Sequence, residues 1–397
     1  MLTRAVAGIA LTAVALLAPA CAAAADDVAS AVRLRQWPLA ELRVPAAWKH
    51  ARGENVVVAV LDTGVDERHP DLLGAVIPGP DLVGGARRAG RYWGHHGTAM
   101  ASLIAGRGHG PGRARGVIGI APAAKILSIR VTLENGDPLR QTKQARRQSE
   151  NAVAAGIRYA ADQGADVISM SLGGGRGVYD GSADEEEAVQ YALAKGAVLV
   201  ASSGNDGADA NRKNFPAAYP GVIAVGAVDR NLRRAPFSNR QGYLSVVAPG
   251  TQIVSADGAD SYVVGDGTSA AAAHVAGVAA LIRGRFPELT PLEVRRAIER
   301  STVRRPKGGH DAEYGHGLVN AERAVDTAGL MAERSATGWD DSGTTVITAS
   351  EHTEYFGGGP TRSAPISRRV LGLTLVLLAA LLAAGAVLTE RHYAHRR

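Results

Sequence analysis

The stretch GDGTSAAAAHVAG, residues 265–277, places one serine between glycines and a row of alanines. Alanine favours helix, so Ser269 falls in the first turn of a predicted helix. In that turn, unpaired N–H groups and the positive end of the helix dipole point outward. Ser269 is therefore a candidate nucleophile if a base and an acid lie nearby. The alternative is an N-cap serine with a structural role.

Histidine is the usual base for a serine nucleophile near neutral pH, and a carboxylate orients the histidine. The stretch YWGHHGTAMASLIAG (92–106) offers His95 and His96 at the start of an apolar helix. His274 lies five residues into the predicted serine helix and cannot readily reach back to Ser269. Three other histidines lie in glycine-rich loops and are predicted to be surface residues: His109, His310 and His316.

Apolar, β-branched runs alternate with helical stretches from residue 55 onward. Helices are predicted at 151–164 and 184–196, and buried strands are predicted at residues 55–63, 124–132, 165–173, 197–205 and 222–229. This order predicts an α/β fold with a mostly parallel central sheet and helices on both faces, in which ligands bind at the carboxyl ends of the strands. The polar or glycine-rich residues at those ends are Asp62, Asn205 and the SLGGG stretch at 171–175.

Four stretches resemble blocks of the subtilisin-like serine proteases (subtilases). These are VAVLDTGVDERHPDL (58–72), HHGTAMA (95–101), SSGN (202–205) and GTSAAAAHVAG (267–277), in that family's order. The resemblance extends from about Trp37 to Ala328. It implies a serine endopeptidase with a three-layer subtilisin-like fold, and we place this peptidase domain at residues 55–330.

The resemblance also implies roles for individual residues. Ser269 corresponds to the nucleophile, Asp62 to the orienting carboxylate, and His96, which directly precedes Gly-Thr, to the general base and acid. Asn205 and the backbone N–H of Ser269 correspond to the oxyanion hole. Five further residues match the segments that bind the substrate: Ser171, Leu172, Gly173, Ser203 and Gly204.

Two positions depart from the family pattern without removing a catalytic group. Ala273 replaces the usual proline before the histidine of the serine block, and Ala99 replaces a second histidine in the histidine block. A structural calcium ion is common in the family. No loop here has acidic residues that clearly form a calcium site, so we assign no metal and no cofactor.

The composition excludes other classes of function. The net charge is +6, but the basic residues are scattered and aromatic residues make up 5%, so no nucleic-acid partner is indicated. Cys21 is the sole cysteine, which excludes an internal disulfide framework and a cysteine-based zinc site. The tripeptide Asp62-Thr63-Gly64 is also typical of aspartic proteases, but those need two such motifs.

Both ends of the sequence carry membrane signals. Residues 1–25 have the charged, apolar and small-residue regions of a signal peptide, although Cys21 in a poor lipobox leaves lipidation as an alternative. A 26–54 extension precedes the peptidase domain, and a polar linker follows it at 331–367. Residues 368–389 predict a transmembrane helix, because Val370–Leu388 carries no charge and spans about 28 Å. The tail at 390–397 is predicted to be cytoplasmic and the peptidase domain extracellular.

This layout resembles that of the mycosins, the membrane-anchored subtilases associated with type VII secretion. The resemblance implies a protein or peptide substrate, attachment to the cell membrane, and components of the secretion machinery as partners. An alternative is a protease-fold scaffold that is inert or weakly active and that stabilises a secretion complex by contact. Because every catalytic residue type is present, the sequence favours the enzyme.

Overall fold

The computed structural model describes residues 28–84, 92–173, 181–258 and 260–336. The predicted signal peptide lies outside these residues, as do the predicted transmembrane helix, the cytoplasmic tail and most of the linker. Among the helices that are described, none is both long and apolar enough to cross a membrane.

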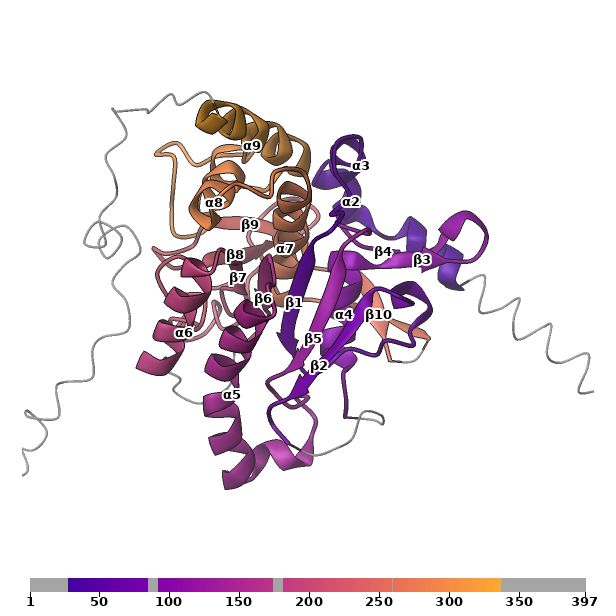
Figure 1. Ribbon diagram of the computed structural model, residues 1–397, viewed down its shortest axis with the longest axis vertical. Helices are drawn as coiled ribbons and strands as arrows, with labels where there is room; N and C mark the ends of the chain where they lie inside the picture. Colours follow the sequence, from indigo (N-terminus) through magenta and orange to yellow (C-terminus); the bar gives the residue numbers. More distant parts are fainter. Residues whose placement is uncertain (1–27, 85–91, 174–180, 259, 337–397) are drawn as a thin grey trace, which may run out of the picture. The chain divides into compact units, whose positions relative to one another are not determined.

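A parallel sheet of seven strands lies at the centre of the described residues (Figure 1). Its strand order is β2-β5-β1-β6-β7-β8-β9, and every pair of neighbours is parallel. The bounds are β1 Val57–Asp62, β2 Val76–Asp81, β5 Lys125–Arg130, β6 Val167–Met170, β7 Val198–Ser202, β8 Ile223–Val228 and β9 Val246–Pro249. The five predicted strands correspond to β1, β5, β6, β7 and β8, so the prediction of a mostly parallel sheet is confirmed.

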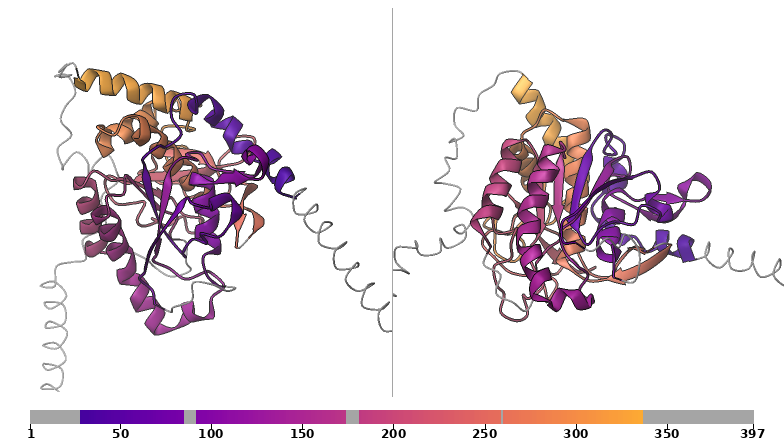
Figure 2. Two further views of the ribbon diagram at one scale, coloured as in Figure 1. Left: turned by 45° about the vertical axis from the view of Figure 1, so that its right-hand side comes forward. Right: turned by 60° about the horizontal axis from the view of Figure 1, so that its bottom comes forward.

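Helices cover both faces of this sheet (Figures 1 and 2). Helices α5 (Lys143–Asp162) and α6 (Ala183–Ala194) pack side by side on one face, and α4 (His95–Ala105) and α7 (Thr268–Arg285) pack together on the other. Helix α5 begins eight residues before its predicted start. Helices α8 (Pro291–Arg300) and α9 (Ala321–Ala336) pack against α7, and α9 extends six residues into the segment predicted as linker.

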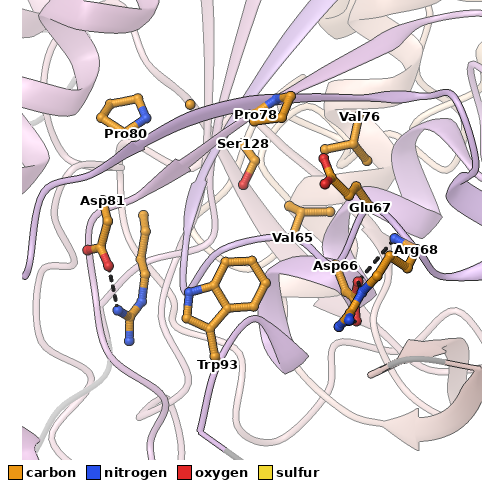
Figure 3. Close-up of a pocket in the computed structure, with 12 residues that line it drawn as sticks. Val65, Asp66, Glu67, Arg68, Val76, Pro78, Pro80, Asp81, Trp93 and Ser128 are labelled. Atoms are coloured by element: carbon orange, nitrogen blue, oxygen red, sulfur yellow. Dashed lines mark hydrogen bonds and ion pairs between the residues drawn. The ribbon is translucent and has the colours of Figure 1, made fainter. Parts of the chain in front are cut away.

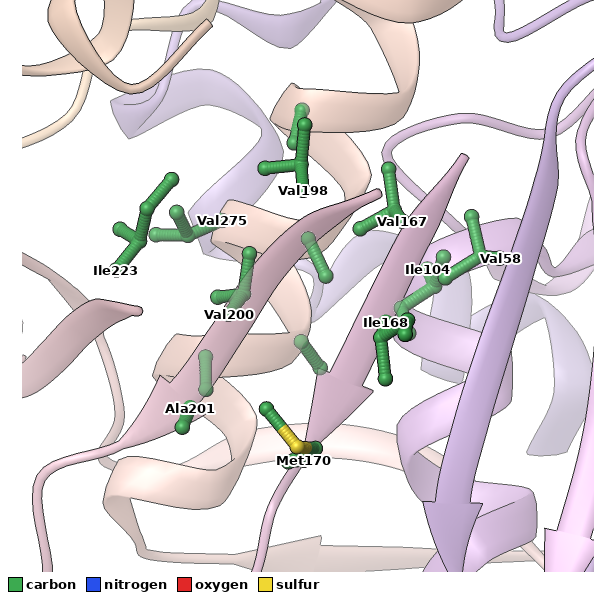
Figure 4. Close-up of a cluster of buried hydrophobic side chains, with 14 of the residues drawn as sticks. Val58, Ile104, Val167, Ile168, Met170, Val198, Val200, Ala201, Ile223 and Val275 are labelled. Carbon is green, nitrogen blue, oxygen red and sulfur yellow. The ribbon is translucent and has the colours of Figure 1, made fainter. Parts of the chain in front are cut away.

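Helix α7 is buried along almost its whole length because its alanine-rich sequence lets the strands approach closely. Val275 of α7 lies with Ile223 and Val200 in the cluster shown in Figure 4, and Ile104 of α4 lies near Ile168. Burial of such aliphatic side chains supplies about 25 cal/mol per Å². The serine block is thus carried by a helix that is buried along almost its whole length, which fixes the position of its first turn.

In the described part of the chain, two short antiparallel hairpins lie outside the main sheet. Strands β3 (Arg107–His109) and β4 (Arg115–Ile118) form one, and β10 (Ile253–Asp257) and β11 (Ser261–Gly265) form the other. The second hairpin leads directly into α7. Short 3-10 helices lie at η1 Pro70–Leu72, η2 Pro111–Arg113 and η3 Pro138–Gln141.

The described part of the 26–54 extension packs on the peptidase domain. It contains α2 (Trp37–Glu41) and α3 (Val44–Ala47), and the Trp48 indole N–H donates to the Ile120 carbonyl at 2.7 Å. The Gln36 amide donates to and accepts from the backbone of Ile118, both at 2.9 Å. The extension therefore shares the core with the helices and strands that follow it.

Candidate active site

Asp62 and His96 form a close pair at the carboxyl end of the sheet. Asp62 is the last residue of β1, and its side chain is 1% exposed. The His96 Nδ1 atom lies 2.7 Å from Asp62 Oδ1 and 2.9 Å from Oδ2. Nδ1–H therefore donates to the carboxylate, which fixes the tautomer and leaves Nε2 as the basic nitrogen.

The sequence brings α4 close to the end of β1 by placing glycine where the two segments meet. A Cβ atom at Gly97 would overlap the Gly64 carbonyl and lie 3.2 Å from Asp62 Cβ. The Gly97 N–H donates to Thr63 Oγ1 at 3.0 Å. Helix α4 can therefore begin directly against the turn that follows Asp62, which holds His96 in place.

The pKa of His96 is raised above its ordinary value of 6.5. Burial lowers this pKa, but the charge of Asp62 and its hydrogen bond outweigh burial, and Glu134 acts in the same direction. The side chain remains 34% exposed. A histidine of this kind can take up a proton and hold it as an ion pair with Asp62.

Ser269 is the second residue of α7, and Gly267 occupies the cap position. The alternative of an N-cap serine is therefore wrong. Asn205, which follows β7, accepts hydrogen bonds through Oδ1 from the Thr268 N–H at 2.9 Å and from its hydroxyl at 2.8 Å. Ser171 Oγ donates to the Ser269 carbonyl at 3.1 Å. The ends of β6 and β7 thus hold the first turn of α7.

Asn205 Nδ2 and the Ser269 N–H flank one position. A Cβ atom built on Gly267 would lie 3.6 Å from Asn205 Nδ2 and 3.7 Å from Ser269 N. Both predicted oxyanion-hole donors therefore lie close to the same position, beside the first turn of α7.

The predicted catalytic residues thus form two groups at the carboxyl ends of the sheet's strands. Asp62 and His96 come from β1 and α4, while Asn205 and Ser269 come from β7 and α7, and α4 packs against α7. Among the described residues, the hydrogen bonds of the His96 ring run to Asp62, and none joins the ring to Ser269.

The predicted substrate-binding residues lie at the ends of two neighbouring strands. Gly173 and Gly204 have φ of 100° and 105°, a region that disfavours other residues. The Leu172 carbonyl already accepts from Ser202 Oγ at 3.1 Å and from Asn214 Nδ2 at 3.0 Å. The Ser203 side chain is fully buried. The Ser203 backbone is buried as well, and its N–H donates to the Val225 carbonyl at 2.9 Å, whereas Ser171 contacts Ser269.

The other histidines have partners of their own. His95 Nδ1 lies 2.6 Å from Asp257 Oδ1 of the β10–β11 hairpin. His274 is 2% exposed, and its Nδ1–H donates to the Pro249 carbonyl at 3.1 Å; burial lowers its pKa to about 4. The three histidines predicted to be surface residues are half-buried, and each is hydrogen-bonded: His109 to Asp71, His310 to Leu244 and His316 to Gly309.

A small hollow lies beside the turn that follows Asp62, between that turn and the edge strand β2 (Figure 3). The Trp93 ring lies between Asp81 and Asp66, and Asp81 accepts from Arg130 at 2.8 Å. A Cβ atom at Gly64 would lie 2.8 Å from the Trp93 ring. The hollow is lined by residues other than the predicted site residues.

No group of three or more acidic, histidine or cysteine side chains in the described ranges could hold a metal ion. The sequence could not identify Thr268, Glu134 or Asp257 as parts of the site. Thr268 lies within the serine block but carries no predicted role, and Glu134 and Asp257 lie outside all four blocks.

The fold and the site define a protease of the subtilisin type. Residues 53–317 match the model of the subtilase family, Peptidase S8. The chain therefore belongs to the subtilase family and is a serine endopeptidase.

Two curated relatives illustrate this membership. Thermitase from Thermoactinomyces vulgaris is 38% identical over 291 residues, which cover 73% of this chain and 96% of thermitase. Fervidolysin from Fervidobacterium pennivorans is 37% identical over 309 residues, and the match spans 70% of this chain but 42% of fervidolysin.

Solved structures of MycP1 are similar to this chain. MycP1 from Mycobacterium smegmatis is 30% identical with a TM-score of 0.60, and the match covers 73% of this chain and 84% of MycP1. A second MycP1 structure is 32% identical with a TM-score of 0.62, and the match covers 73% of this chain and 88% of that MycP1 chain. That MycP1 is described as a serine protease and an essential component of the type VII (ESX-1) secretion system.

Proposed function

We propose that this chain hydrolyses peptide bonds through Ser269, His96 and Asp62. The observation that carries the proposal is the Asp62–His96 hydrogen bond of 2.7 Å. It lies at the carboxyl end of the sheet, where Ser269 is in the first turn of α7. In this mechanism, Nε2 of His96 removes the Ser269 hydroxyl proton as Oγ attacks the substrate carbonyl. Asp62 stabilises the imidazolium that forms.

The tetrahedral intermediate places negative charge on the former carbonyl oxygen. Asn205 Nδ2 and the Ser269 N–H stabilise this oxyanion by donating to it. His96 then returns its proton to the leaving amine, and the peptide bond breaks. Water hydrolyses the acyl-enzyme with His96 again acting as base, which restores the Ser269 hydroxyl.

The test is peptide-library cleavage by the purified full-length chain, with Ser269→Ala as control. We expect internal peptide bonds to be cut by the wild type and left intact by the variant. A folded wild type that cuts no member of the library would favour the alternative function, in which the protease fold is a scaffold that acts by contact.

We further propose that the peptidase domain is held at the outer side of the cell membrane by residues 368–389 and acts with type VII secretion components. The apolar segment and the likeness to MycP1 support this proposal. Carbonate extraction and protease accessibility of a tag placed after Arg397 test it. We expect the chain to stay in the membrane pellet, with the tag protected in intact cells. Release into the carbonate supernatant would contradict the anchor.

A further inference from the structure

The helix that carries His96 begins without a cap of its own. Gly94 occupies the cap position of α4 in a left-handed conformation and has no side chain to satisfy the first N–H groups. Two residues from other segments satisfy them instead. Thr63 accepts from the Gly97 N–H at 3.0 Å, and Glu134 Oε1 accepts from the His96 N–H at 3.1 Å.

Glu134 reaches His96 from a segment that is also bound to Asp62. The residues after β5 run along the end of β1, where the Asp62 carbonyl accepts from the Val131 N–H at 2.9 Å and from the Thr132 N–H at 3.3 Å. Two residues later, the Glu134 carboxylate meets His96. One short segment therefore connects the backbone of the carboxylate residue to the backbone of the base.

We propose that Glu134 is a positioning residue for catalysis, whose carboxylate caps α4 and holds the His96 backbone in register with Asp62. This inference rests on the proposed function, since it concerns the base of the same reaction. A carboxylate at a helix N-terminus also complements the helix dipole. The cap thus contributes both a hydrogen bond and a negative charge next to His96.

The charges around His96 make this role measurable. The groups that face it are Asp62 from β1, Glu134 from the segment after β5, and Arg140 from η3. Burial lowers the pKa of His96. The negative charges of Asp62 and, to a smaller extent, Glu134 raise it, and the positive charge of Arg140 lowers it. The adjacent His95 is paired with Asp257 of β10.

Arg140 is held in the same loop as Glu134. Its guanidinium donates to the Leu133 carbonyl at 3.0 Å and to Asn135 Oδ1 at 2.7 Å. Removing the negative charge of Glu134 disfavours the imidazolium, so the titration of His96 moves to lower pH. Removing the positive charge of Arg140 moves it to higher pH. The two substitutions therefore have opposite expected signs.

The first measurement does not depend on turnover. In the full-length chain with Ser269→Ala, the His96 ring carbon resonance is followed against pH by NMR with labelled histidine. We expect Glu134→Gln to lower the midpoint of the His96 titration and Arg140→Gln to raise it. The control is Glu67→Gln, which removes an exposed carboxylate from the segment between Asp62 and His96 and should leave the midpoint in place. Midpoints that coincide for all variants would overturn the inference.

The second measurement separates positioning from folding. In the active chain, we expect Glu134→Ala to lower kcat about tenfold on the high-pH plateau with little change in KM, because a charged hydrogen bond to the helix is lost. Glu134→Gln, whose amide oxygen can still accept from the His96 N–H, restores most of that rate. A variant Glu134→Ala that loses thermal stability but keeps the wild-type kcat contradicts a positioning role.

The two measurements separate this inference from the proposed function. A wild type that cuts no peptide speaks against the proposed function, while the NMR midpoints still decide whether Glu134 acts on His96.

Discussion

Asn205 Oδ1 accepts two hydrogen bonds from Thr268, one from its N–H at 2.9 Å and one from its hydroxyl at 2.8 Å. The oxygen of the amide is thereby occupied, which leaves Nδ2 as the group that can donate to a substrate. Thr268 thus orients Asn205, the side chain that is proposed to stabilise the transition state.

Substitution of Asn205 by alanine tests this relationship. We expect Asn205→Ala to lower kcat by about 10²-fold or more with the fold intact, because one oxyanion donor is lost. Thr268→Val removes one of the two hydrogen bonds that orient Asn205, so we expect a smaller loss of about fivefold. Steady-state kinetics and circular dichroism provide the measurements. Unchanged turnover in Asn205→Ala would refute the oxyanion assignment.

The two adjacent histidines are expected to respond very differently to substitution. His96→Ala removes the base and should lower kcat/KM by about 10⁴-fold or more. His95→Ala removes a half-exposed pair with Asp257, and such pairs contribute little to stability, so we expect activity within about tenfold of the wild type. Kinetics of the two variants at one pH give the comparison. A greater loss in His95→Ala would show that the roles are reversed.

The raised pKa of His96 predicts the pH dependence of the reaction. His96 must be neutral to accept a proton, so kcat/KM falls as pH drops through its pKa. We expect the midpoint of the acid limb, the pH at which kcat/KM is half its plateau value, to lie above 6.5.

Asp62→Asn removes the charge that favours the imidazolium, and the rate should fall about 10⁴-fold because the tautomer is no longer fixed. An acid-limb midpoint below 6.5 in the wild type would conflict with the Asp62–His96 pair.

His274 predicts a loss of stability in acid. Its pKa is about 4 when folded and 6.5 when unfolded, so the unfolded state binds more protons between these values and stability falls as pH drops from 6.5 to 4. The loss from this residue is about 3 kcal/mol. His274→Asn can keep the hydrogen bond to the Pro249 carbonyl without titrating. We expect urea unfolding to show that the variant loses less stability than the wild type, whereas parallel losses would contradict the prediction.

The strands and the Asp62–His96 pair could be predicted because their signals are local. β-branched runs predicted β1, β5, β6, β7 and β8, and the motifs placed Asp62 and His96 at the ends of adjoining elements. Residues that act across distant segments could not be found in this way. Glu134 caps a helix 38 positions earlier, and Asp257 pairs with a histidine 162 positions away.

The histidines outside the pair show the same limit. Glycine-rich surroundings indicated surface loops for His109 and His310. In the structure, His109 belongs to β3 and lies 2.6 Å from the buried Asp71, and His310 lies 2.7 Å from the Leu244 carbonyl. Glycine indicates backbone freedom, but it does not indicate exposure, and the partners of these rings come from segments that are remote in the sequence.

Labelling by a fluorophosphonate probe tests the central claim most directly, because the probe reacts with a serine that a neighbouring base has activated. We predict that the full-length wild type is labelled at Ser269, that Ser269→Ala is not labelled, and that His96→Ala is labelled far more slowly. A folded wild type that remains unlabelled, or label found on a serine other than Ser269, would contradict the account.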